Sequence, residues 1–329
     1  MQGIKILGTG HYSPQQIVTN DYLSKFMDTN DEWITTRTGI KRRHISDGEP
    51  TWYMAAKAAE EALKAAGTKA EDIDLILLSS TTEDFFLPSG ACMVQREIGA
   101  SGCMAVDINC ACSGFVYAID MARRYLAFDD IKKVLVVASE SLSKITDYDD
   151  RSTCVLFADG AGACVVEASD SFYSSFHGAD GNGAKFLVAK HIHHVHDIIK
   201  GSQTFEDGLP DSGKECIIQD GKEVYKFATS ILPFAAKSAA EKAGINIDEI
   251  DYFIPHQANI RIIETAAKKL KVSMDKFIVN IEEYANTSSA SIVIAFDEAV
   301  RNGKIKRGDK ICFVGFGAGL TYGAVIIEY

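Results

Sequence analysis

Residues 106–126 read VDINCACSGFVYAIDMARRYL, and this stretch decides the fold. The short apolar run from Val106 to Asn109 predicts a strand, and Phe115 to Leu126 carries apolar residues on one face at helical spacing. Cys112 lies in the turn between them, beside the N-terminus of the predicted helix. Unpaired backbone N–H groups and the positive end of the helix dipole favour a thiolate there. We therefore expect Cys112 to have a lowered pKa and to act as a nucleophile, the alternative being a buried, inert thiol.

The same pattern recurs once, 177 residues further along the chain. Around the first helix, Asn109, Val116, Ala118, Asp120, Ala122 and Arg124 recur as Asn286, Val293, Ala295, Asp297, Ala299 and Arg301. Two other segments recur at this shift: Ala66-Gly67 with Ile73-Asp74 as Ala243-Gly244 with Ile250-Asp251, and the apolar run from Lys133 as the run from Lys310. One shift that fits three separated segments predicts a duplicated α/β unit, with two halves packed around a pseudo-twofold axis.

Elsewhere, short β-branched runs alternate with alanine-rich helical stretches, which predicts mostly parallel sheets covered by helices. The predicted strands are Gly3–Thr9, Ile73–Ser79, Lys133–Ala138, Asp251–Ile254, Lys310–Gly315 and Ala324–Glu328, with a helix over Thr51–Ala66. The loosest stretch runs from about Asp170 to Gly213, and we place the boundary near its start. The predicted halves are residues 1–175, with the nucleophile, and residues 176–329.

Composition excludes several classes of protein. The chain has 329 residues and a net charge of −11, which argues against a generally basic surface for nucleic acid. We find no apolar run long enough to cross a membrane and no signal peptide. Eight cysteines in a chain of this length are typical of reduced thiols in a cytoplasmic protein.

Two further groups are candidates for chemistry with Cys112. His256 follows a predicted strand directly, and Asn286 lies at the second strand-to-helix turn by the repeat. Because strand ends of parallel sheets place ligands where two halves meet, these groups are expected to converge. A thiol, an imidazole and an amide suggest acyl transfer, and the glycine-rich segment 315–319 could offer backbone N–H groups to an oxyanion. Taken separately, His256 could be a structural histidine, Asn286 could be a helix cap, and segment 315–319 could be a tight turn.

Several motifs together resemble the β-ketoacyl-acyl-carrier-protein synthase III family over essentially the whole chain. They are DTNDEWITTRTGIKRRHI (Asp28 to Ile45), CACSGF around Cys112, FADGAGA (Phe157 to Ala163), PHQANIRI around His256 and NTSSAS from Asn286. The resemblance implies a thiolase-like five-layered αβαβα fold, a homodimer and no cofactor, with acyl-CoA as a substrate. It also implies a reaction: an acyl-CoA and malonyl-acyl-carrier protein condense with loss of carbon dioxide, which starts fatty-acid synthesis.

The resemblance further assigns roles to individual residues. Cys112 would carry the acyl group, His256 and Asn286 would stabilise the enolate, and the N–H groups of Cys112 and Ala318 would form the oxyanion hole. The implied CoA contacts are Trp33, Arg37, Arg151 and Asn259. Leu87 would limit the acyl pocket from across the dimer interface. Leucine at that position, in place of a bulkier aromatic residue, could leave room for longer or branched starters.

For the carrier, the implied docking residues are Lys226, Arg261, Lys268 and Lys269. The sequence adds its own indication, because Arg261, Lys268, Lys269 and Lys271 gather within eleven residues of an otherwise acidic chain. On a helix, Arg261 and Lys268 share a face and could steer an acidic partner. A solvated helix face is the alternative.

Other interpretations of the protein's function stay open. The principal alternative is a secondary-metabolism relative that loads an unusual starter or transfers an acyl group to oxygen or nitrogen, and a non-catalytic scaffold is a second. The Gly8-Thr9-Gly10 segment lacks the third glycine of a dinucleotide loop, where Ser13 stands. The histidine run 191–196 could bind a metal ion if its side chains gathered, but we expect a surface loop and no resident metal.

Overall fold

The computed structural model describes residues 3–128, 130–191 and 208–329. Its strands are β1 (Gly3–Tyr12), β2 (Gln16–Thr19), β3 (Arg42–Ile45), β4 (Leu75–Ser79), β5 (Met104–Ile108), β6 (Lys133–Ser141), β7 (Asp159–Ser169), β8 (Tyr173–Ala179), β9 (Leu187–Ala189), β10 (Ile217–Gln219), β11 (Tyr252–Pro255), β12 (Lys310–Gly317) and β13 (Thr321–Glu328). Its α-helices are α1 (Asn20–Leu23), α2 (Asp31–Thr38), α3 (Thr51–Ala66), α4 (Gly90–Ile98), α5 (Gly114–Tyr125), α6 (Arg151–Cys154), α7 (Gly221–Lys242), α8 (Ile260–Leu270), α9 (Ile281–Tyr284) and α10 (Ala290–Arg301).

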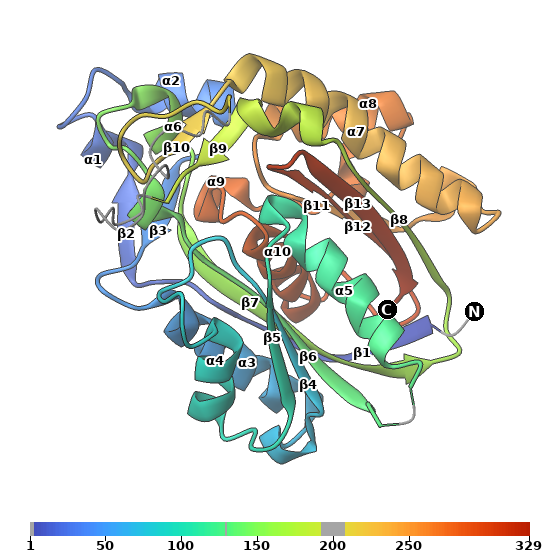
Figure 1. The fold of residues 1–329 in the computed structure, drawn as a ribbon. Coiled ribbons are helices and arrows are strands. Elements are labelled where there is room, and N and C mark those ends of the chain that lie inside the picture. The colour runs from blue at the N-terminus through green and yellow to red at the C-terminus, as the bar shows by residue number, and fades with distance from the viewer. Residues whose placement is uncertain (1–2, 129, 192–207) are drawn as a thin grey trace.

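Two main sheets and three helical layers alternate through the molecule (Figure 1). The first sheet has the strand order β1-β7-β6-β4-β5 and the second has the order β11-β12-β13-β8. Helices α5 and α10 lie between the sheets, α3 and α4 cover the outer face of the first, and α7 and α8 cover the outer face of the second. The predicted αβαβα architecture is confirmed. Each sheet pairs parallel strands (β5-β4-β6 and β11-β12) with antiparallel neighbours, so the expectation of mostly parallel sheets is wrong.

The two halves repeat individual hydrogen bonds as well as elements. Asp74 Oδ2 accepts from the Lys133 backbone N–H at 2.9 Å, and Asp251 Oδ2 accepts from the Lys310 N–H at 2.8 Å. The carboxylates of Asp120 and Asp297 each accept from the Nε of an arginine one helical turn later, Arg124 and Arg301, at 2.7 Å in both cases. All four pairs obey the shift of 177 residues, so the duplication predicted from the sequence is present in the packing.

The stretch expected to be loosest contains part of the second sheet. Strand β8 pairs with β13 from Tyr173 to Ala179, so the predicted boundary after residue 175 falls inside a strand. We propose residues 170–172, between β7 and β8, as the division between the halves. Within the described residues, every helix is too short or too polar to span a bilayer.

The Gly8-Thr9-Gly10 segment belongs to β1 and packs against α3. A Cβ on Gly8 would lie 2.2 Å from the Ala66 nitrogen, and one on Gly10 would lie 2.4 Å from the Ala62 nitrogen. These glycines therefore let a strand approach a helix backbone closely. Alanines of α3 face the strand, and their small side chains also allow the strand and the helix to pack closely.

We predict that Gly10→Ala destabilises the protein by about 1–3 kcal/mol, because the added methyl group meets helix backbone that cannot move aside. Urea unfolding followed by circular dichroism measures the change. Gly181→Ala is the matched control, since nothing lies within 4 Å of a Cβ at that glycine. Equal unfolding midpoints for the two variants would contradict the close packing.

Candidate active site

Cys112 lies in a strained turn between β5 and α5. The residue before it, Ala111, has φ 47°, and Ser288, which the duplication pairs with Ala111, has φ 52°. Non-glycine residues in this left-handed region cost about 1–3 kcal/mol unless the surroundings hold them, and such strain gathers at functional sites. Both turns therefore keep the same strained shape, and Cys112 and Ser289 follow at equivalent positions. The expectation that a strand precedes the second turn is wrong, because the short helix α9 and an isolated bridge at Asn286 stand there.

Cys112 lines two neighbouring spaces, which also share Phe157 and Leu187. The first is a cavity of about 440 Å³, and the second is a narrow passage of about 90 Å³. The cavity walls are largely apolar and include Leu142, Ile145, Phe157, Leu187 and Ile217. The passage is lined by Cys112, His256 and Asn286. The structure thus brings the three predicted catalytic residues together, although they come from separate loops.

The expectation of a lowered thiol pKa is wrong for the unliganded site. Burial raises the pKa of Cys112 to about 12, and the charge of Glu140 adds to the rise. A hydrogen bond from Ser288 and the backbone N–H of Cys112 lower the pKa, but by less. Desolvation therefore outweighs the polar contacts of the turn. The resting nucleophile is a neutral thiol.

His256 is also neutral, since burial lowers its pKa to about 3. Its Nδ1 lies 2.8 Å from Ser291 Oγ, which also accepts from the Gln257 backbone N–H at 3.1 Å. Ser291 donates to the Ser288 carbonyl at 2.7 Å, so this network assigns the ring proton to Nδ1. Nε2 then carries a lone pair and can take a proton. If Ser291 instead donates to Nδ1, the proton moves to Nε2, which becomes a donor.

The side chain of Asn286 has a fixed orientation. Its Oδ1 accepts from the Ser288 backbone N–H at 2.9 Å, which leaves the Nδ2 amide group as a donor. The Asn286 backbone pairs with the segment before β7, through its N–H to Leu156 and its carbonyl to Ala158. Asn286 can therefore stabilise negative charge on a bound oxygen.

The candidate oxyanion hole lies where the turn after β12 meets the nucleophile turn. A Cβ on Gly317 would lie 2.5 Å from the Cys112 nitrogen, so only glycine allows this approach. Thr321 links the two turns, because its hydroxyl donates to the carbonyls of Ala318 (3.0 Å) or Cys110 (3.1 Å) and lies 2.8 Å from Ser113 Oγ. Cys112 and Ala318 both line the larger cavity, as the predicted hole requires.

The predicted CoA contacts gather at the surface around Trp33. The guanidinium carbons of Arg37 and Arg151 lie 4.7 and 5.0 Å from the centre of the indole ring. Asn259 caps α8 and donates to the Arg37 carbonyl at 3.0 Å, and it also lines the passage to Cys112. These four residues form one continuous surface from the indole ring to the passage.

The predicted carrier contacts lie on the adjacent helices α7 and α8 (Figure 1). Lys226, Arg261, Lys268 and Lys269 are all exposed. Lys269 Nζ donates to the Thr229 carbonyl of α7 at 3.0 Å, so its stem crosses between the helices. The basic residues therefore form a surface patch beside the passage rather than part of it.

One chain does not test the role predicted for Leu87, and it does not test metal binding by the histidine run. Leu87 does not line the cavity and is 87% exposed, so a role in the pocket requires a second copy. Of the histidine run, residues 192–196 lie outside the described part of the chain. His191 lies 3.5 Å from Glu83, at the edge of the cavity.

Sequence reasoning missed the residues that orient the catalytic groups. Ser291 and Thr321 are ordinary small polar residues in helix and strand segments, and no spacing distinguishes them. Glu140 had a usable signal, because an acidic residue ends the apolar strand that begins at Lys133. A charged group at a buried strand end in a parallel sheet usually faces a site.

Because unfolded His256 binds a proton below about pH 6.5 and the folded residue does not, unfolding free energy should fall as pH drops from 6.5 towards 3. This residue alone should account for about 1.4 kcal/mol by pH 5.5. Urea unfolding of wild type and His256→Gln across this range isolates the contribution, since other groups titrate alike in both. Parallel pH profiles would contradict a buried neutral imidazole.

Comparison with known proteins agrees with this geometry. The family described as 3-oxoacyl-[acyl-carrier-protein (ACP)] synthase III matches residues 106–184, and its C-terminal part matches residues 240–329. The chain is 46% identical to the β-ketoacyl-[acyl-carrier-protein] synthase III of Clostridium acetobutylicum, and the match covers 100% of this chain and 99% of the relative.

Solved structures give the same result. The 3-oxoacyl-[acyl-carrier-protein] synthase III of Aquifex aeolicus superposes with a TM-score of 0.90 at 43% identity, covering 99% of this chain and 100% of that one. The priming β-ketosynthase of the R1128 polyketide pathway has a TM-score of 0.90 at 34% identity, covering 99% and 96%. The chain belongs to the β-ketoacyl-acyl-carrier-protein synthase III family.

Proposed function

We propose that this protein condenses an acyl-CoA starter with malonyl-acyl-carrier protein, with loss of carbon dioxide, and so initiates fatty-acid synthesis. The observation that carries the proposal is the arrangement at Cys112. The thiol faces an apolar cavity suited to an acyl chain, and it shares a narrow passage with His256 and Asn286. Family membership supports the choice of substrates, and the positions of Cys112, His256 and Asn286 support a role for each side chain.

In the first step, the Cys112 thiol passes its proton to Nε2 of His256 as the sulfur attacks the acyl-CoA carbonyl. The oxyanion that forms is stabilised by the backbone N–H groups of Cys112 and Ala318, and such donors typically contribute 10²–10³ in rate. The tetrahedral intermediate collapses, the C–S bond to CoA breaks, and His256 returns the proton to the CoA sulfur. The acyl group remains on Cys112 in the apolar cavity.

In the second step, malonyl-carrier enters through the passage and its carboxylate leaves as carbon dioxide. The electron pair moves into an enolate whose oxygen accepts from Asn286 Nδ2 and from His256 Nε2–H. The Ser291 hydroxyl supports this second tautomer by donating to Nδ1. The carbanion attacks the acyl–Cys112 carbonyl, and the C–S bond breaks to give the β-ketoacyl-carrier and the Cys112 thiolate. The thiolate then takes from solvent the one proton that the overall reaction consumes, which restores the neutral thiol. These steps use protein groups and the two thioesters, and they need a reduced thiol, as expected of a cytoplasmic enzyme.

We infer a homodimer in which the edge strand β5 and the loop between β4 and α4 meet a second copy. β5 pairs with β4 along one edge, and Met104 on it is 46% exposed. In the loop, Phe85, Phe86 and Leu87 are 47%, 76% and 87% exposed. Apolar side chains beside an open strand edge favour burial against a partner. The partner's cavity would then receive Leu87, whose size leaves room for starters longer than acetyl.

The test of the function is intact-mass spectrometry after incubation with a panel of acyl-CoAs, followed by malonyl-carrier. We expect a thioester on Cys112 that malonyl-carrier discharges to a β-ketoacyl product. Cys112→Ala should form no adduct, whereas Asn286→Ala should form the adduct and fail to discharge it. An adduct that malonyl-carrier cannot discharge in wild type would favour the alternative of acyl transfer to another acceptor.

The same panel of acyl-CoAs also identifies which starter acyl group the enzyme prefers. Leucine at position 87, in place of a bulkier aromatic residue, favours longer or branched acyl groups. Strict preference for acetyl-CoA would contradict the role proposed for Leu87.

For the carrier patch, we predict that Lys268→Glu combined with Lys269→Glu raises the KM for malonyl-carrier more than tenfold, because two attractive charges become repulsive. Acylation of Cys112 by acyl-CoA should be unchanged. Lys64→Glu, at an exposed lysine on α3, is the matched control. Equal losses in both half-reactions would contradict a docking role.

A further inference from the structure

Arg43 of β3 is a buried arginine to which the proposed reaction gives no role. It is 0% exposed, and burial lowers its pKa to about 10, so the guanidinium stays charged at neutral pH. Its strand partner Val18 belongs to a core cluster with Leu23 of α1, Ile34 of α2 and Cys154 of α6. A charge in such surroundings costs stability unless its donors are satisfied, so this arginine needs an explanation.

In the described part of the chain, the hydrogen bonds of Arg43 go to three uncharged oxygens. Nη1 donates to the Val18 carbonyl at 3.2 Å, and Nη2 donates to Asn20 Oδ1 at 2.8 Å and to the Val155 carbonyl at 3.1 Å. Asn20 is the first residue of α1, and Val155 caps the C-terminus of α6. One guanidinium therefore connects two helices that are far apart in the sequence.

Asn20 extends this connection to α2. Its Nδ2 donates to Asp31 Oδ1 at 2.9 Å, at the start of the helix, and to the Ile40 carbonyl at 2.7 Å, just beyond its end. Because Asn20 Oδ1 accepts from Arg43, the amide is held with both of its N–H bonds towards α2. Asn20 is 1% exposed, so water does not compete for these bonds. The amide fixes both ends of α2 relative to the guanidinium.

Helices α2 and α6 carry the side chains that surround Trp33. Trp33 and Arg37 lie one turn apart on α2, and Arg151 begins α6. Their guanidinium carbons lie 4.7 and 5.0 Å from the centre of the indole ring, so these contacts depend on the separation of the two helices. Helix α6 has only four residues and cannot keep its position without tertiary contacts.

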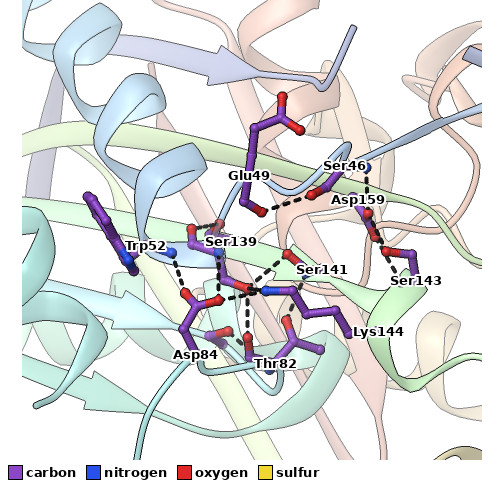
Figure 2. Close-up of polar contacts among 12 residues, drawn as sticks. Ser46, Glu49, Trp52, Thr82, Asp84, Ser139, Ser141, Ser143, Lys144 and Asp159 are labelled. Atoms are coloured by element: carbon purple, nitrogen blue, oxygen red, sulfur yellow. Dashed lines mark hydrogen bonds and ion pairs between the residues drawn. The ribbon is translucent and has the colours of Figure 1, made fainter. Parts of the chain in front are cut away.

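The hairpin that carries Arg43 is itself anchored to the first sheet. Asp159, at the start of β7, accepts from the Ser46 N–H at 2.8 Å and from the Ser143 hydroxyl at 2.6 Å (Figure 2). Ser46 follows β3 directly, and its hydroxyl donates to the Glu49 carbonyl at 2.8 Å. The Asp159 carboxylate thus holds the end of the hairpin in place, and the guanidinium acts from a fixed base.

We propose that Arg43 is a positioning residue for CoA binding, which holds α2 and α6 at the separation that their side chains around Trp33 need to bind CoA. This inference rests on the proposed function, because it takes the surface around Trp33 as the CoA site. Arg43 is fully buried and does not touch CoA. Its rigid fork of donors reaches Asn20 and Val155 at once, which neither a lysine nor an apolar side chain can do.

The experiment compares CoA binding, measured by isothermal titration calorimetry, with acylation of Cys112 by two donors. One donor is an acyl-CoA, and the other is the N-acetylcysteamine thioester of the same acyl group, which lacks the nucleotide. We expect Arg43→Met to weaken CoA binding about tenfold, because a preorganised site becomes mobile. The KM for acyl-CoA should rise by the same factor. The maximal acylation rate and the rate with the short thioester should stay within about twofold of wild type, since neither depends on the CoA surface.

Arg307→Met is the matched control. Arg307 also donates to two backbone carbonyls, those of Ile6 (2.6 Å) and Leu7 (3.2 Å), but these belong to β1. Its loss should leave CoA binding unchanged. Unchanged CoA binding in folded Arg43→Met would overturn the proposal. Equal slowing of acylation by both donors would also overturn it, because it would indicate a general loss of structure.

Asn20→Ala tests the same connection if Arg43→Met does not fold. It leaves the guanidinium bonded to the carbonyls of β2 and α6 but removes the bonds to α2. Trp33 also reports without a ligand, because in a Trp52→Phe background it is the single tryptophan. Asn20→Ala should make its fluorescence more sensitive to quenching by acrylamide and should weaken CoA binding about tenfold. Quenching and CoA binding equal to those of the Trp52→Phe parent would contradict the proposal.

These measurements separate the role of Arg43 from the condensation reaction. If malonyl-carrier failed to discharge the thioester on Cys112 while CoA binding changed as described, the proposed function would fail and the role of Arg43 would stand. If the thioester were discharged and the variants bound CoA like wild type, the reverse would hold.

Discussion

The contact between the N-termini of α5 and α10 is the constraint on which the rest of the site depends. A Cβ on Gly114 would lie 1.9 Å from Ser79 Oγ, and Ser79 in turn lies 3.3 Å from Ser289 Oγ. Glycine at the start of α5 allows this close approach to Ser79 of β4, and the Ser289 side chain of the turn before α10 then lies in contact, 3.6 Å from the Gly114 Cβ position. That meeting places Cys112 against the loop of Asn286 and the turn after β12, and it fixes where substrates can enter.

Burial sets the resting charge of the site. The same desolvation that raises the pKa of Cys112 lowers that of His256, so neither group is ionised before substrate arrives. A thiolate becomes favourable only when its charge can pass to a carbonyl oxygen facing the backbone donors. The enzyme therefore avoids a permanently reactive thiolate, and its reactivity is conditional on a bound thioester. Ser291 suits this arrangement because a hydroxyl can support either neutral tautomer of the imidazole.

Much of the fold and the location of the site follow from the sequence. The shift of 177 residues relates the turn of Cys112 to the turn of Asn286, and His256 follows a short apolar strand, so these three residues could be expected to converge. The thiol pKa could not be predicted, because it depends on how much water the finished cavity excludes. The strand in residues 173–179 was missed because its pairing with β13 outweighs a polar local composition. The role expected of Leu87 cannot be tested in one chain, where its side chain is exposed and lies outside the cavity.

The duplication has a consequence at one pair of positions. The shift that relates the halves pairs Glu140 on β6 with Gly317 on β12. On one side, a carboxylate fills the space beside Ser289 and is tied by hydroxyls. On the other, the missing side chain lets the end of β12 approach the Cys112 nitrogen so closely that a Cβ would lie only 2.5 Å away. The same strand position is therefore filled in one half and bare in the other, so the two strand ends cannot exchange roles.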